Sequence, residues 1–140
     1  MKLISHRGNT SGRDKKNENN PDYIISAIEK GFDCEVDIWQ LDGFYLGHDE
    51  PVYPVDIDLL LRYHNKLWIH CKNLESLESL SQNPHLNVFW HEKDSYTLTS
   101  KGFIWTYPHN KICSRSVIVS NDAKYSKFQK CYGVCSDKLT

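Results

Sequence analysis

The sequence predicts an α/β fold with a mostly parallel sheet, in the form of a shortened (β/α)8 TIM-type barrel with several outer helices reduced or lost. Candidate strands alternate with candidate helices in the first half of the chain, which is typical of a parallel sheet. Seven or eight candidate strands are present, which is enough to close a barrel. A full (β/α)8 barrel usually needs about 250 residues, so a barrel made from 140 residues must lack several helices.

The first half of the chain gives the clearest alternation. A short apolar run at 2–5 predicts a strand, and the polar stretch at 9–21 predicts a surface loop. Pro21 and Asp22 suit the first turn of a helix that Gly31 ends, giving a predicted helix at 22–30. The other elements predicted here are a strand at 32–39, a turn at 42–43, an extended piece at 44–46, a helix at 56–64, a strand at 67–71 and a helix at 74–80.

The second half contains four more candidate strands, and the links between them are short and mostly lack helical periodicity. These strands are predicted at 87–91, 103–107, 116–120 and 132–135, with a helix only at 122–130. The outer helices of the barrel are therefore expected to be missing mainly from this half.

The composition is that of a single soluble globular domain covering residues 1–140, because the chain is too short for two stable cores. The mean hydropathy is −0.59, and no apolar run approaches the length of a membrane span. A net charge of −1 argues against a nucleic-acid partner. Five cysteines, an odd number without a secretory signal, indicate reduced thiols and a cytoplasmic location. Nothing in the sequence indicates whether the protein is a monomer or an oligomer.

Two carboxylates carry the strongest chemical signal. Side chains alternate along a strand, so Glu35 and Asp37 point to the same face of the strand at 32–39. Two stacked carboxylates repel each other unless a cation lies between them, and Mg²⁺ or Ca²⁺ is a natural partner for oxygen ligands. In isolation, a simpler interpretation is favoured, in which both residues lie on the solvent face of an antiparallel strand.

Histidines and cations lie near the ends of other candidate strands. His70 and Lys72 share one face, and Lys72 and Arg7 are suited to binding an anionic group such as phosphate. His6 and His48 are candidates for a general acid and a general base. Each has a simpler interpretation: His70 as a hydrogen-bonded core histidine, and His48 as an ordinary loop residue.

The order of these motifs resembles the N-terminal signature of the glycerophosphodiester phosphodiesterases, in the superfamily that includes phosphatidylinositol-specific phospholipase C. The matching pieces are His6-Arg7-Gly8, Glu18-Asn19-Asn20, the run at 31–37, Asp42-Gly43 and His48-Asp49. Weaker similarities continue at 68–72, 104–106 and 133–137, so the resemblance extends along nearly the whole chain.

The resemblance implies a shortened barrel that hydrolyses a small glycerophosphodiester-like substrate with the help of a divalent metal ion. It implies that His6 and His48 are the acid and base, that Arg7 and Lys72 bind the phosphate, and that Glu35 and Asp37 are metal ligands. The resemblance also implies Mg²⁺ or Ca²⁺ as the metal.

One position departs from the family pattern, because His70 stands where the family has a third metal-binding Glu. If His70 is the third ligand, the preference shifts toward Mn²⁺ or Zn²⁺, which bind imidazole well. Alternatively, Glu92 or Asp137 is the third ligand, or the chain is a catalytically weak or inactive module that binds a phosphorylated ligand. A structural zinc site at Cys131 and Cys135 is a further alternative, although their spacing fits poorly.

Overall fold

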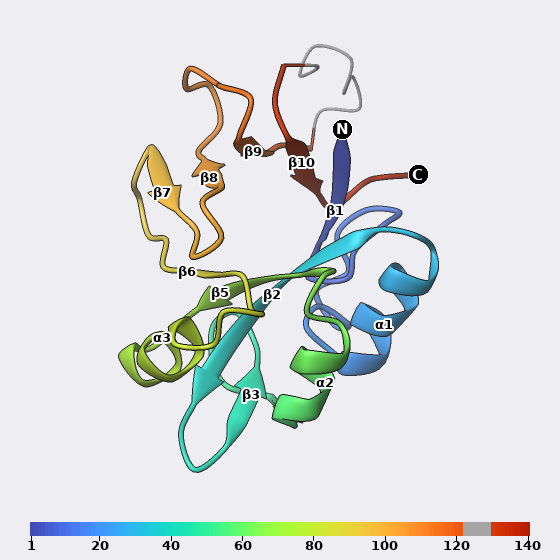
Figure 1. Ribbon diagram of the computed structural model, residues 1–140. Helices are drawn as coiled ribbons and strands as arrows, with labels where there is room; N and C mark the ends of the chain where they lie inside the picture. The colour runs from blue at the N-terminus through green and yellow to red at the C-terminus, as the bar shows by residue number, and fades with distance from the viewer. Residues whose placement is uncertain (122–129) are drawn as a thin grey trace.

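The computed structural model describes residues 1–121 and 130–140, which form one mixed sheet and three short helices (Figure 1). The predicted helix at 122–130 falls almost entirely outside the described residues. The strands are β1 (Lys2–His6), β2 (Asp33–Gln40), β3 (Phe44–Leu46), β4 (Tyr53–Val55), β5 (Leu67–Cys71), β6 (Val88–Phe89), β7 (Tyr96–Leu98), β8 (Ile104–Thr106), β9 (Ser116–Val119) and β10 (Gly133–Ser136). The helices are α1 (Pro21–Glu29), α2 (Ile57–Arg62) and α3 (Leu74–Ser81).

The sheet consists of a parallel central run with an antiparallel extension at two places. The parallel strands follow the spatial order β6-β5-β2-β1-β10-β9-β8. The β3–β4 hairpin pairs with the C-terminal half of β2, and β7 pairs antiparallel with β8. The first and last strands of the chain, β1 and β10, are therefore neighbours at the centre of the sheet.

The prediction of a shortened (β/α)8 barrel is wrong. The described residues form a mixed sheet of ten strands with three short helices, whereas a (β/α)8 barrel places a helix after each strand. The hairpins are one physical reason, because β4 and β7 are short strands that fold back on their neighbours by antiparallel pairing. Sequence reasoning missed both β4, with Pro54 at its centre, and β7.

Each helix begins at an asparagine or aspartate whose side chain caps it. Asn20 accepts a hydrogen bond from the backbone N–H of Asp22, Asp56 accepts one from Asp58, and Asn73 accepts one from Ser76. Figure 1 shows the three helices beside β2 and β5. They cover the outer face of these strands, where Val36, Ile69 and their neighbours form the larger apolar core.

The opposite face of the sheet is curved around a second, aromatic core. This core contains Ile4, Trp68, Phe89, Trp105, Val117 and Cys135, which come from six different parallel strands. The rings of Phe89 in β6 and Trp105 in β8 stack with their centroids 4.6 Å apart. These outer strands of the parallel run thus meet through side chains, although no backbone ladder joins them among the described residues.

None of the helices within 1–121 and 130–140 is long and apolar enough to cross a membrane.

Candidate metal centre

The strand register brings the predicted acidic and histidine residues together above the aromatic core. Parallel pairing places His6 of β1 beside Glu35 of β2, and Asp37 of β2 beside His70 of β5. Glu35 is 2% exposed and Asp37 is fully buried, so the interpretation as a solvent face is wrong. The group lies at the C-terminal ends of parallel strands, which is where ligands bind in many α/β proteins.

Glu35, Asp37 and His70 each direct a ligand atom toward a common point. These three atoms all lie within 4.8 Å of one another, which suits a shared metal ion. Glu35 Oε2 and Asp37 Oδ1 are buried and accept no hydrogen bond from the described residues. Such oxygens are expensive to bury without a cation or a proton donor, so the donor set fits a metal.

The orientation of His70 adds an independent reason for a cation. His70 Nε2 lies 2.9 Å from the backbone oxygen of His91, and because a carbonyl can only accept, Nε2 carries the hydrogen. In the neutral imidazole, the lone pair of Nδ1 then faces the carboxylates, 3.2 Å from Asp37 Oδ1 and 3.9 Å from Glu35 Oε1. Three lone-pair donors facing one another repel, and either a proton on Nδ1 or a divalent cation relieves the repulsion. A backbone partner of this kind commonly orients metal-binding histidines.

The two carboxylates titrate very differently. Burial and the neighbouring charge of Asp37 raise the pKa of Glu35 from 4.5 to about 7. Burial also acts to raise the pKa of Asp37, but the adjacent His70, when its imidazole is protonated, and the charge of Arg7 outweigh it and lower the pKa. Arg7 Nε lies 3.1 Å from Asp37 Oδ2, so the ionised Asp37 already has a cationic partner. Glu35, by contrast, has two histidines as its nearest ion-pair partners among the described residues, His6 Nε2 at 3.6 Å and His70 Nδ1 at 3.9 Å.

His6 belongs to a histidine–aspartate pair next to the cluster. His6 Nδ1 lies 2.9 Å from Asp137 Oδ1, while Nε2 lies 3.6 Å from Glu35 Oε2. Burial acts to lower the pKa of His6, but the hydrogen bond with Asp137 and the charge of Glu35 outweigh it and raise the pKa. Burial acts to raise the pKa of Asp137, but its bonds to His6 and Asn9 hold that pKa at about 2. An ionised Asp137 therefore holds one nitrogen of His6 and leaves the other facing the cluster.

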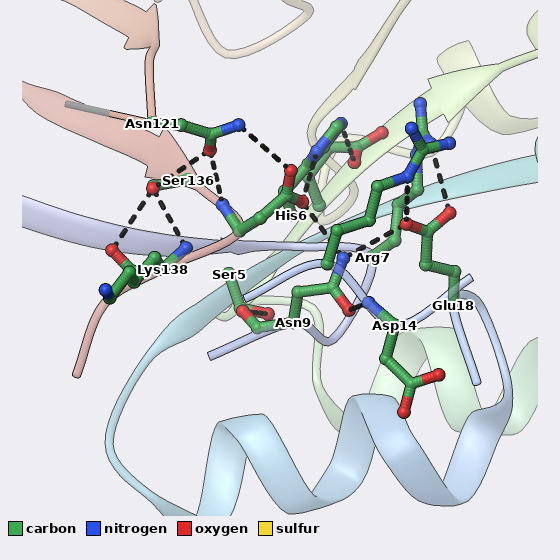
Figure 2. A network of polar contacts seen from close by, with 12 residues as sticks. Ser5, His6, Arg7, Asn9, Asp14, Glu18, Asn121, Ser136 and Lys138 are labelled. Carbon is green, nitrogen blue, oxygen red and sulfur yellow. Dashed lines mark hydrogen bonds and ion pairs between the residues drawn. The ribbon is translucent and has the colours of Figure 1, made fainter. Parts of the chain in front are cut away.

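A buried asparagine connects this pair to Arg7. Asn9 Nδ2 donates to Asp137 Oδ1 at 2.9 Å and to Glu18 Oε1 at 3.2 Å (Figure 2). Glu18 Oε2 in turn accepts from Arg7 Nη1 at 3.2 Å. Figure 2 shows how these contacts run from Arg7 and Glu18 through Asn9 toward His6. The network fixes Arg7 and His6, which are consecutive in the chain, relative to each other.

Sequence reasoning missed the roles of Asn9 and Asn121. Asn121 accepts from the backbone N–H of Asp137 at 3.0 Å and donates to its carboxylate at 3.2 Å. A usable signal was present, since Asn121 is the second residue after β9 and so lies at the same end of the sheet as the cluster. Asn9 sits in the polar loop after β1, and its sequence context alone does not distinguish it from its polar neighbours.

Two predicted residues lie at the margin of the cluster. His48 is exposed at the rim, with Nδ1 2.7 Å from Asp49 Oδ1, and it lines a hollow of about 210 Å³ together with Arg7 and Glu18. Lys72 directly follows β5 and is half-buried, and no ion pair joins it to an acidic group in the parts of the chain that are described. Their roles as acid or base and as phosphate ligand stay predictions.

The three residues considered as the third metal ligand lie in different surroundings. The cluster contains His70, whereas Glu92 is exposed and Asp137 is bound to His6. Cys131 and Cys135 lie in two separate apolar groups, and within the described residues no cysteine belongs to a metal-binding cluster.

Comparisons of the chain with protein-family models, with curated proteins and with solved structures give no match.

Proposed function

We propose that the protein is a metal-dependent phosphodiesterase acting on a glycerophosphodiester-like substrate. The observation that supports this most is the cluster of three possible ligands, Glu35, Asp37 and His70, beside His6 Nε2, which lies 3.6 Å from Glu35 Oε2. Two carboxylates and one imidazole suit Mn²⁺ or Zn²⁺ and also accept Mg²⁺, whereas Ca²⁺ prefers oxygen ligands alone. A bound divalent cation would supply positive charge to the non-bridging oxygens of a phosphate.

The protein's own residues have distinct tasks in this proposal. His6 Nε2 accepts a proton from the nucleophile, either water or a neighbouring substrate hydroxyl, and Asp137 stabilises the imidazolium that forms. Arg7 contributes positive charge between Asp37 and the hollow that it lines with His48, so the phosphate is expected to lie beside Arg7. His48, on the rim of that hollow, is the candidate acid that protonates the leaving alkoxide.

A non-catalytic module that binds a phosphorylated ligand is the second candidate. Arg7 is already engaged by Asp37 and Glu18, and His48 is exposed with Asp49 as its partner. Both features are compatible with recognition of an anion without turnover.

Hydrolysis assays separate the two functions. Glycerophosphodiesters and bis(p-nitrophenyl) phosphate are incubated with the protein and Mg²⁺, Ca²⁺, Mn²⁺ or Zn²⁺, and product is followed by ³¹P NMR or absorbance. We expect metal-dependent turnover that is lost in His6→Ala and retained in His85→Ala, a matched control at an exposed histidine. Turnover equal in wild type and His6→Ala would refute the enzyme and leave the binding module.

A further inference from the structure

A large hollow adjoins the candidate metal centre on the side of His6. Its volume is about 780 Å³, and His6 and Asp137 form part of its wall. Apolar side chains line much of the remainder, namely Pro108 and Ile112 from the loop after β8, and Ile118 and Val119 from β9. A space of this size is within the range of roughly 300–1,000 Å³ typical of small-molecule sites.

The two hollows beside the cluster differ in chemistry. The smaller one is lined by charged groups of both signs, with Arg7, Arg13 and Lys15 opposed by Glu18, Asp49 and Glu50, and it suits a small polar substituent of a phosphate bound at Arg7. The larger one has His6 and Asp137 next to the cluster and an apolar surface formed by Pro108, Ile112, Ile118 and Val119. Its remaining lining residues are polar, namely His109, Asn110, Lys111, Ser120 and Asn121. Because His6 lines one hollow and Arg7 lines the other, a phosphodiester held between these residues directs one substituent into each.

We propose that the larger hollow binds one alcohol group of the substrate, and that this group is mostly apolar and larger than glycerol, such as an alkyl or aryl alcohol. This inference rests on the proposed phosphodiesterase function. A second glycerol would leave the apolar surface of Ile112 and Val119 in contact with water, whereas an alkyl chain buries it. Each methylene that becomes buried there strengthens binding by about fourfold.

A homologous series of alkyl glycerophosphates tests the proposal. kcat/KM is measured from the methyl to the hexyl ester by ³¹P NMR, in wild type, in Ile112→Trp and in Val52→Trp. Val52 lines the smaller hollow and is 50% exposed, so its substitution by Trp is a matched control. The ratio of hexyl to methyl rates is taken within each variant, which makes the result independent of the fraction of protein that folds.

We expect kcat/KM to rise about fourfold per methylene in wild type and Val52→Trp, and to be nearly flat in Ile112→Trp. Equal rates for methyl and hexyl esters in wild type would overturn the proposal. A rise that survives in Ile112→Trp but disappears in Val52→Trp would also overturn it, because the chain would then occupy the smaller hollow.

A binding measurement separates this inference from the proposed function. Calorimetry compares methyl phosphate with hexyl phosphate on the Mn²⁺-treated protein. Tighter binding of hexyl phosphate that is lost in Ile112→Trp supports the apolar subsite, even if no ester is hydrolysed. Equal affinity for the two phosphates overturns the subsite, whether or not small diesters are cleaved.

Discussion

His6 Nδ1 and Asp137 Oδ1 lie 2.9 Å apart and join the first strand of the sheet to the segment after the last strand. The contact is possible because β1 and β10 pair in parallel, with Ser5 opposite Ser136. It orients the imidazole so that Nε2 faces Glu35, and it makes the position of His6 depend on the pairing of β10 with β1.

Replacing Asp137 with Asn tests this orientation. The amide keeps the shape of the side chain but not the negative charge that stabilises a protonated His6, so kcat is expected to fall about 10- to 100-fold. Binding of Mn²⁺, measured by calorimetry, is expected to change little, because Asp137 is not in the cluster. Asp49→Asn, the equivalent change beside His48, is a comparison for a more exposed pair. An unchanged kcat in Asp137→Asn would contradict the assigned role of Asp137.

Asn9 is predicted to be essential for stability. Its side chain is fully buried, donates to Asp137 and Glu18, and accepts from Tyr23 Oη and the N–H of Asp14. Removing it leaves buried polar groups unsatisfied, so Asn9→Ala is expected to lower the free energy of unfolding by about 2–3 kcal/mol. Urea denaturation measures the change, with the exposed Asn17 replaced by Ala as the control. A loss as small as that of the control would show that the network contributes little.

The metal-free protein is predicted to lose stability as the pH rises from about 4.5 to about 7. The pKa of Glu35 is raised from 4.5 to about 7 by burial and by Asp37, so over this range the folded state binds more protons than the unfolded state. The raised pKa of His6 acts in the same direction at higher pH. The expected loss is on the order of 2–3 kcal/mol. Urea denaturation at several pH values should show this slope in wild type and a weaker one in Glu35→Gln, while equal slopes would contradict the assignment.

Metal binding is predicted to stabilise the fold. A cation that binds only the folded state at 100 times its dissociation constant adds about 2.7 kcal/mol to the free energy of unfolding. Thermal unfolding is compared with and without Mn²⁺ after treatment with a chelator, in wild type, Glu35→Gln and Asp33→Asn. Asp33 is an acid on the same face of β2 that contacts Trp68, outside the cluster. The increase in Tm is expected in wild type and Asp33→Asn only, and an equal increase in Glu35→Gln would exclude Glu35 as a ligand.

The sequence was sufficient to predict the central part of the site. The period of two in a strand places Glu35 and Asp37 on one face, and the parallel register places His70 of β5 beside Asp37, whereas Lys72 lies just beyond the end of β5. Most helices and strands were also predicted close to their observed bounds, because their caps and apolar patterns are local signals. Local signals of this kind do not determine which strands pair.

The parts that could not be predicted depend on contacts between distant segments. The barrel was wrong because β4 and β7 are too short to give a clear pattern and form hairpins instead of leading into helices. His48 lies in the link between β3 and β4, so its position relative to the cluster depends on how this hairpin folds. The bonds of Asn9 to Glu18 and Asp137 span 9 and 128 residues, and residue type alone cannot indicate such partners.

The central claim is that Glu35, Asp37 and His70 hold a divalent cation next to His6. Pulsed electron paramagnetic resonance of bound Mn²⁺, in protein with ¹⁵N-labelled histidine, measures the coupling between the metal and a histidine nitrogen. We expect a coupled nitrogen in wild type and His85→Ala that is lost in His70→Ala. Mn²⁺ bound without nitrogen coupling, or with coupling unchanged in His70→Ala, would contradict the claim.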